Sequence, residues 1–153
     1  MTCPRVPARA PLAGDGPPSA TGGLVSCSPS RPIRLLVADD DARVRAAIGQ
    51  TVALEADLVI VAEAADGAAA LALALATGPS VALVDVLIPD EATGLALVAS
   101  LCRRPGCAVV AMSVRSGLRR AALAAGAVAF AEKAGDIDAV LDAVRAAALP
   151  HHA

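Results

Sequence analysis

Short apolar runs alternate with longer alanine-rich segments from residue 33 to near the end of the chain. Five runs are rich in β-branched residues and have the length of strands: residues 33–38, 57–64, 81–85, 107–112 and 127–131. Their apolar residues are consecutive rather than alternating, which is typical of strands buried on both faces of a parallel sheet. The pattern therefore predicts five parallel strands covered by helices on both sides.

The segments between these runs carry helical periodicity. Apolar residues recur at helical spacing in residues 44–52 and 137–144, and residues 95–102 and 118–125 also fit helices. Residues 66–79 are ambiguous because leucines alternate there as in a strand, but the alanine content, an aspartate at the start and a Gly-Pro end favour a helix. The alternation predicts an α/β domain of the (βα)5 class, with a doubly wound, five-stranded parallel sheet.

The domain organisation follows from composition. Residues 1–32 contain seven prolines and four glycines but few large apolar side chains, so they predict a disordered leader. Residues 33–148 are expected to form the folded domain, and residues 149–153 a frayed C-terminal end.

Charge and hydropathy exclude several classes of protein. Apolar residues make up 56% of the chain, yet a charge, a glycine or a proline interrupts every apolar run before the ~18 residues of a membrane span. The net charge is -2 and no basic stripe appears, so we expect no direct DNA binding. The four cysteines lack CxxC spacing, which favours packing over metal binding. We expect a cytoplasmic protein without membrane contact.

Polar side chains stand where the predicted strands end. Asp39 and Asp40 follow the first strand, Asp85 closes the third, Ser113 follows the fourth, and Lys133 comes just past the fifth. Ligands of open α/β sheets bind beyond the carboxyl ends of the strands, where strand order reverses. We therefore expect three carboxylates, one hydroxyl and one ammonium to converge at this edge.

Three carboxylates at one site require a compensating cation, because like charges and burial both oppose ionisation. Oxygen ligands without His or Cys favour Mg²⁺, which we expect as the cofactor. With this ion and Lys133 nearby, Asp85 can stay ionised and act as a nucleophile toward phosphorus. Ser113 would then contact a phosphoryl oxygen.

Four segments, "LLVADDDARVR", "VALVDVLIP", "VVAMS" and "FAEK", together resemble the response-regulator receiver domain of two-component signalling. The resemblance covers about residues 33–148 and implies a flavodoxin-like fold. It implies that Asp39 and Asp40 hold Mg²⁺, with Asp40 the more direct ligand. It also implies that Asp85 accepts a phosphoryl group from the phosphohistidine of a partner kinase.

The same resemblance assigns roles around Asp85. The backbone carbonyl of Leu87 would be a further metal ligand, and Ser113 and Lys133 would engage the phosphoryl group. Phe130, the only aromatic residue of the chain, occupies the family's aromatic switch position.

Three positions around these motifs need a separate interpretation. Asp41 varies in the family, and we interpret it as a helix N-cap rather than a metal ligand. Gly94 comes one residue later than the common pattern, which leaves the geometry of the loop after Asp85 open. Lys133 is followed by alanine rather than proline, which resembles receivers that are normally joined to helix-turn-helix outputs.

The resemblance also implies a biological role. We expect a phosphoacceptor signalling domain that promotes its own phosphorylation and dephosphorylation, rather than an enzyme. Its partners would be a sensor histidine kinase or a phosphotransfer protein, and an unknown downstream protein. Whether the chain forms a homodimer is left open by the sequence. Because only 20 residues follow Lys133, we expect signalling through protein contacts without an output domain.

Two alternatives remain open at the level of sequence. In a haloacid-dehalogenase-like phosphatase, Asp39 would be the nucleophile in Asp39-x-Asp41, and Asp136 and Asp138 would supply the last acids. That alternative leaves Asp85 without a role. The second is a degenerate receiver that acts as an unphosphorylated interaction module, although all five expected site positions are retained.

Overall fold

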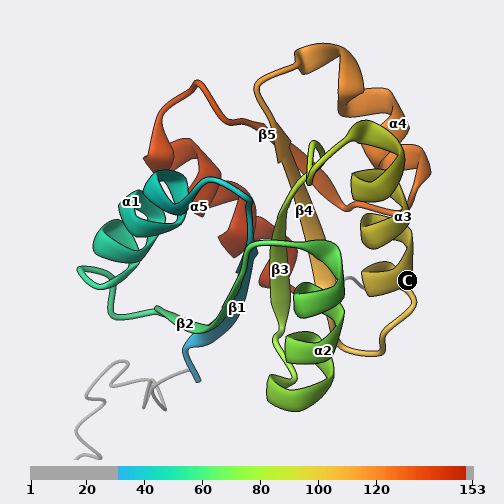
Figure 1. The fold of residues 1–153 in the computed structure, drawn as a ribbon. Coiled ribbons are helices and arrows are strands. Elements are labelled where there is room, and N and C mark those ends of the chain that lie inside the picture. The colour runs from blue at the N-terminus through green and yellow to red at the C-terminus, as the bar shows by residue number, and fades with distance from the viewer. Residues whose placement is uncertain (1–30, 151–153) are drawn as a thin grey trace, which may run out of the picture. The chain divides into compact units, whose positions relative to one another are not determined.

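The computed structural model describes residues 31–150, in which strands and helices alternate (Figure 1). The elements are β1 Ile33–Ala38, α1 Ala42–Val52, β2 Leu58–Ala64, α2 Gly67–Thr77, β3 Val81–Asp85, α3 Glu91–Cys102, β4 Ala108–Ser113, the 3₁₀ turn Ser116–Leu118, α4 Arg119–Ala124, β5 Ala129–Glu132 and α5 Ile137–Ala148. The (βα)5 order predicted from the sequence is confirmed.

All strands of the sheet are parallel, in the order β2-β1-β3-β4-β5. Strand order therefore reverses after β1, which lies between β2 and β3. Ala38 of β1 pairs with Val84 of β3, so the residues that follow these two strands emerge side by side. This is the switch point where an open α/β sheet places its ligand site.

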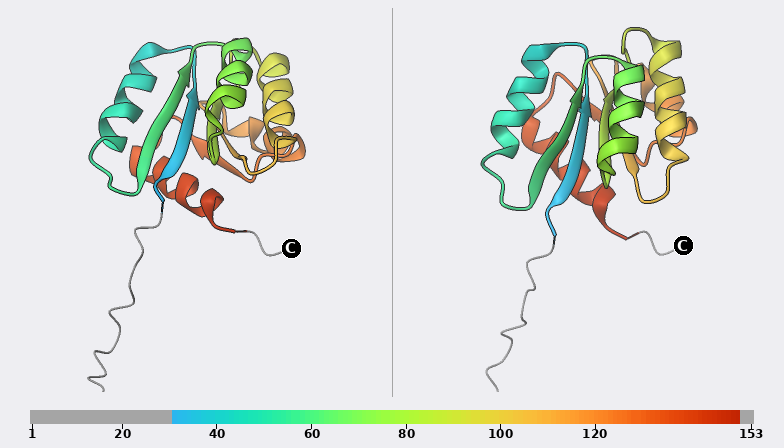
Figure 2. Two further views of the ribbon diagram at one scale, coloured as in Figure 1. Left: turned by 90° about the horizontal axis from the view of Figure 1, so that it is seen from below. Right: turned by 60° about the horizontal axis from the view of Figure 1, so that its bottom comes forward.

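Helices cover both faces of the sheet, with α1 and α5 on one face and α2, α3 and α4 on the other (Figure 2). Side chains of each strand alternate between the two faces, so Leu35 and Val37 pack under α1 and α5 while Leu36 and Ala38 pack under α2 and α3. Burial on both sides explains why the central strands β1 and β3 are predominantly apolar rather than alternating apolar and polar residues.

Aspartates begin four of the helices. Asp41 accepts a hydrogen bond from the backbone of Arg43, and Asp66, Asp90 and Asp136 cap α2, α3 and α5 in the same way. The predicted capping role of Asp41 is confirmed. Asp66 and the left-handed Gly78 bound α2, which confirms that residues 67–77 are a helix.

The structure differs from the sequence prediction mainly at element ends. The helix expected over residues 118–125 is the six-residue α4, and the 3₁₀ turn Ser116–Leu118 precedes it. Residues 1–30 and 151–153 lie outside the described residues, so the leader and the frayed end stay predictions. Among residues 31–150, no helix is long and apolar enough to cross a bilayer.

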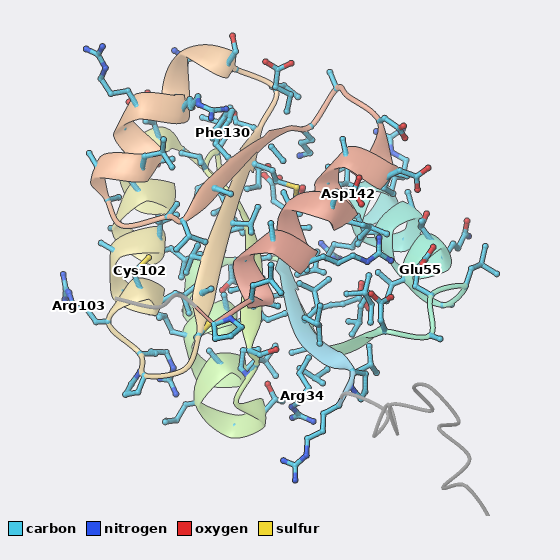
Figure 3. The ribbon with its side chains drawn as sticks, turned by 180° about the vertical axis from the view of Figure 1, so that it is seen from behind. Arg34, Glu55, Cys102, Arg103, Phe130 and Asp142 are labelled. Carbon is cyan, nitrogen blue, oxygen red and sulfur yellow. The ribbon has the colours of Figure 1, made fainter. Side chains whose placement is uncertain are left out.

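Arg145 ties α5 to the turn between α1 and β2. Its guanidinium donates to both carboxylate oxygens of Asp57, at 2.7 and 3.1 Å, and to Glu55 at 2.7 Å. Figure 3 shows Glu55 beside α5, which carries Asp142, a weaker partner at 3.4 Å. The hydrogen bond from Arg145 holds the pKa of Asp57 below its ordinary value.

Arg145→Gln is expected to lower the melting temperature at neutral pH by a few degrees, because this network joins segments about 90 residues apart in sequence. Since the pKa of Asp57 is lower in the folded than in the unfolded protein, the stabilisation is present above the unfolded value near 4 and is lost as the pH falls through the folded value. Thermal melts of both proteins between neutral and acidic pH measure the difference in melting temperature between them.

Arg43→Gln is the matched control, since Arg43 also pairs with an aspartate, Asp41 at 3.5 Å, but its side chain is 94% exposed and such a surface pair contributes little to stability. We expect this variant to follow the parent protein at every pH. If the difference in melting temperature between Arg145→Gln and the parent protein is independent of pH, Arg145 stabilises the protein by packing and not by charge.

Candidate functional site

Three carboxylates gather at the carboxyl edge of the sheet. Asp39 directly follows β1, Asp40 comes next in the chain, and Asp85 is the last residue of the adjacent β3. One oxygen of each lies within 4.8 Å of the others. Asp39 and Asp85 are buried, whereas Asp40 is exposed. The predicted convergence of these three residues is therefore present in the fold.

Lys133 stands between two of these carboxylates. Its Nζ donates to Oδ2 of Asp85 at 2.8 Å and lies 2.8 Å from Oδ2 of Asp39. The side chain is only 14% exposed. Partial burial by itself lowers the pKa of Lys133, but the contacts with the two carboxylates outweigh it and raise that pKa above its ordinary value. The ammonium is charged at neutral pH.

Asp39 is held by its surroundings, but only one of its two carboxylate oxygens accepts a hydrogen bond. Its Oδ1 accepts a hydrogen bond of 2.8 Å from the backbone of Asp41. Its Oδ2 forms an ion pair with Lys133 without hydrogen-bond alignment, so this buried atom accepts no hydrogen bond. Burial raises the pKa of Asp39, and the contacts with Lys133 and Asp41 only partly offset this.

This arrangement fits a hard divalent cation. The cluster offers three carboxylates against one ammonium, and an oxygen of Asp39 has a lone pair without a hydrogen-bond donor. Mg²⁺ requires oxygen ligands and keeps some of its waters, which the exposed Asp40 permits. The residues present are therefore suitable ligands for Mg²⁺.

The loop after Asp85 fixes this carboxylate. The backbone amide of Leu87 donates to Oδ1 of Asp85 at 2.9 Å, so both oxygens of Asp85 are occupied, one by Leu87 and one by Lys133. Gly94 lies against the same loop: a Cβ added there would stand 1.6 Å from the carbonyl oxygen of Val86. The absence of a side chain at Gly94 thus permits close packing of α3 on the loop.

Ser113 and Phe130 lie on the two strands beyond Asp85. Ser113 ends β4, is fully buried, and accepts a hydrogen bond of 3.1 Å from the backbone of Arg115. Its own carbonyl accepts from the backbone of Lys133 at 2.9 Å, which joins β4 to the lysine. Phe130 on β5 is 8% exposed and packs in the core beneath α4 (Figure 3).

One site residue was not anticipated from the sequence. Arg45 of α1 donates to the backbone carbonyl of Asp39 at 2.5 Å and thereby holds the end of β1. Its position six residues after Asp39 within a helix gives no local signal of this contact. Asp136 and Asp138, the last acids of the phosphatase alternative, lie at the start of α5. Asp136 caps this helix and accepts a hydrogen bond of 3.1 Å from the backbone amide of Asp138.

The fold and site agree with solved structures of one family. The receiver domain of the putative response regulator NarL from Mycobacterium tuberculosis is 32% identical and has a TM-score of 0.63, with 75% of this chain and 98% of that chain covered. The response regulator domain of CheB from Thermotoga maritima is 26% identical with a TM-score of 0.69, covering 77% and 97%.

Sequence comparison extends this agreement. An uncharacterized transcriptional regulatory protein of Bacillus subtilis, YvfU, is 32% identical over 117 residues, which are 74% of this chain. The chain spans 58% of the length of that relative. A family model described as "Response regulator receiver domain" matches residues 35–145. Through this match, the chain belongs to the response regulator receiver domain family of two-component signalling.

Proposed function

We propose that Asp85 is the phosphoacceptor of this receiver domain and that Asp39, Asp40 and Asp85 hold Mg²⁺ beside it. The observation that carries the proposal is the carboxylate cluster, whose oxygens lie within 4.8 Å of one another and whose two buried members share Lys133. The backbone carbonyl of Leu87 is a further ligand in this proposal. Membership of the receiver domain family supports Asp85 as the acceptor over the phosphatase alternative with Asp39 as nucleophile.

The proposed reaction transfers a phosphoryl group from a phosphohistidine to Asp85. A carboxylate oxygen of Asp85 forms a bond to phosphorus while the bond from phosphorus to the imidazole nitrogen breaks, and the imidazole keeps the electron pair. Lys133 holds the carboxylate in place and then pairs with the new phosphoryl oxygens. Mg²⁺, when bound, neutralises the charge on those oxygens.

Ser113 and Phe130 would transmit the phosphorylation of Asp85 to the surface of the domain. In this proposal the hydroxyl of Ser113 leaves the backbone amide of Arg115 and donates to a phosphoryl oxygen, which draws the end of β4 toward Asp85. Phe130 lies one strand further and follows that shift. The response is a change in a surface formed by α4, β5 and α5, and its size is limited by the difference in partner affinity between the two states.

The donor in this proposal is a histidine kinase or a phosphotransfer protein, the partners with which receiver domains interact. The phosphorylated surface then acts on a downstream protein. In this proposal the domain accepts the phosphoryl group in a signalling pathway.

Labelling by a small phosphodonor tests this assignment. Acetyl phosphate with Mg²⁺ is expected to add about 80 Da, and hydroxylamine is expected to remove it because an acyl phosphate is labile to that reagent. Chelation of Mg²⁺ with EDTA is expected to suppress the reaction. Absence of labelling from both acetyl phosphate and a panel of phosphorylated kinases would favour the unphosphorylated interaction module.

Mg²⁺ is also expected to stabilise the unphosphorylated protein, because the ion binds a site that only the folded chain assembles. Linkage predicts a gain of about 1.4 kcal/mol at a concentration ten times the dissociation constant. A titration of melting temperature against MgCl₂, with NaCl at equal ionic strength as the reference, measures this.

Asp40→Asn is the informative variant for that titration. Asp40 is exposed, so its replacement leaves the packing of the metal-free protein intact while it removes a charged ligand. We expect the melting temperature without Mg²⁺ to stay near that of the parent and the Mg²⁺-dependent rise to shrink. An equal rise in both proteins would place the ion elsewhere.

A further inference from the structure

The outer face of α2 and α3 is uncharged between its two ends. Helix α2 exposes alanine and leucine side chains only, including Leu71 at 37% and Leu75 at 73% exposure. A helix that faces solvent normally presents charged or polar residues there. From Ala92 to Cys102, α3 also carries no charge. The two helices, Gly67–Thr77 and Glu91–Cys102, lie side by side, and their outer surface forms the α2–α3 face (Figure 1).

The face is hollowed between its helices. A groove of about 650 Å³ runs between α2 and α3, and apolar side chains dominate its lining. Leu71 and Ala68 line it from α2, and Leu97 and Ala96 from α3. The proposed phosphorylation chemistry uses none of these residues, so the exposed apolar surface requires another explanation.

Charge lies only at the two ends of the α2–α3 face, and the ends are opposite in sign. At the carboxyl edge of the sheet, Asp66, Asp90 and Glu91 stand at the starts of α2 and α3. At the other edge the charges are positive. There, Arg104 reaches the carbonyl of Ala74 at 3.4 Å, and Arg103 ends α3.

Arg34 adds to the positive end. Its guanidinium donates to the carbonyl of Thr77, the last residue of α2. Figure 3 shows Arg34 near the end of α2 and Arg103 beyond the end of α3. The face is thus an apolar strip with an acidic end and a basic end.

Such a strip is complementary to itself in one orientation. A two-fold axis that lies in the interface and crosses the helices places α2 against α2 and α3 against α3 of the second copy, each pair antiparallel. The acidic end of each protomer then meets the basic end of the other, and apolar surface meets apolar surface. An axis parallel to the helices would instead put acid on acid and base on base.

We propose that the α2–α3 face is a homodimer interface in which two copies of this chain pack antiparallel. Helices of 11 and 12 residues are about 17 Å long, so the interface would bury roughly 500 Å² of the surface of each protomer. The surface buried by both protomers together is below the ~1,200–2,000 Å² that stable complexes bury. The dimer is therefore weak and reversible.

Sedimentation velocity of the full chain from about 5 to about 500 μM tests this, because a weak dimer appears within that range. We expect a concentration-dependent monomer–dimer equilibrium. Leu75→Lys is expected to weaken it at least about tenfold, since a charge is brought into the apolar strip. Leu54→Lys is the matched control: Leu54 is 85% exposed but lies in the turn after α1, so the equilibrium should not change.

A charge exchange tests the orientation. Glu91→Arg and Arg103→Glu are each expected to weaken the dimer, and the double variant is expected to restore it because each new charge again meets its opposite. Circular dichroism of every variant checks that the fold is retained. A chain that stays monomeric at the highest concentration, or a dimer unaffected by Leu75→Lys, overturns the proposal, and the face then belongs to a different partner. If the double variant does not restore the dimer, the antiparallel arrangement is wrong.

Discussion

Asp85→Asn is expected to abolish phosphorylation, with labelling by acetyl phosphate and by any cognate kinase reduced more than about 100-fold. The amide of asparagine is not nucleophilic toward phosphorus, and it removes one charge from the proposed Mg²⁺ site. Asparagine has the same shape as aspartate, so Leu87 can still donate to the side-chain oxygen. Intact-mass spectrometry over a time course measures the loss.

The fold of this variant is expected to persist. Replacing Asp85 leaves Lys133 with Asp39 as its remaining carboxylate at 2.8 Å, so the ammonium keeps a partner. Asp41→Asn is the matched control, because it makes the same chemical change two residues from Asp39, at a capping position where asparagine serves as well as aspartate. Asp41→Asn should label like the parent. Persistent labelling of Asp85→Asn would place the acceptor on another residue.

Gly94→Ala is expected to destabilise the protein by about 3 kcal/mol or more. The added Cβ would lie 1.6 Å from the carbonyl oxygen and 2.4 Å from the carbonyl carbon of Val86. Both atoms belong to the backbone, so the conflict cannot be relieved by rotating a side chain. Either α3 or the loop after Asp85 must move.

Chemical denaturation measures the change, and Gly49→Ala provides the control. Gly49 lies inside α1, and a Cβ added there meets only the side chain of Ile60, at 3.8 Å. Alanine is the better helix former, so Gly49→Ala is expected to stabilise the protein by about 0.5–1 kcal/mol. If Gly94→Ala proves as stable as the parent, α3 does not pack against the loop as described.

The sequence predicted the topology because burial on both sheet faces leaves a strong pattern. Residues 35–38 and 81–84 are apolar without interruption, and the runs 33–38 and 81–85 match β1 and β3 residue for residue. The end of α4 and the start of β5 were less certain, since alanine and glycine fill residues 124–127 and leave the boundary between the two elements unmarked. Helix ends were predictable where an aspartate caps them, as Asp41 and Asp66 show.

The site could be predicted to the extent that strand order brings strand ends together. Asp39 and Asp85 are neighbours because β1 and β3 pair in register, and the spacing of motifs in the chain indicated this. The detailed bonding was not predictable. Lys133 contacts two carboxylates 48 and 94 residues away, and Arg145 joins Asp57 across 88 residues, distances at which no local pattern exists.

A crystal structure of the protein with Mg²⁺ and beryllofluoride, a stable mimic of the phosphoryl group, tests the central claim most directly. We expect beryllium on a carboxylate oxygen of Asp85 and the metal between Asp39, Asp40 and Asp85, with the carbonyl of Leu87 as a ligand. We also expect Ser113 and Lys133 in contact with the fluorides. Beryllofluoride on any other side chain, or a cation bound away from these carboxylates, would contradict it.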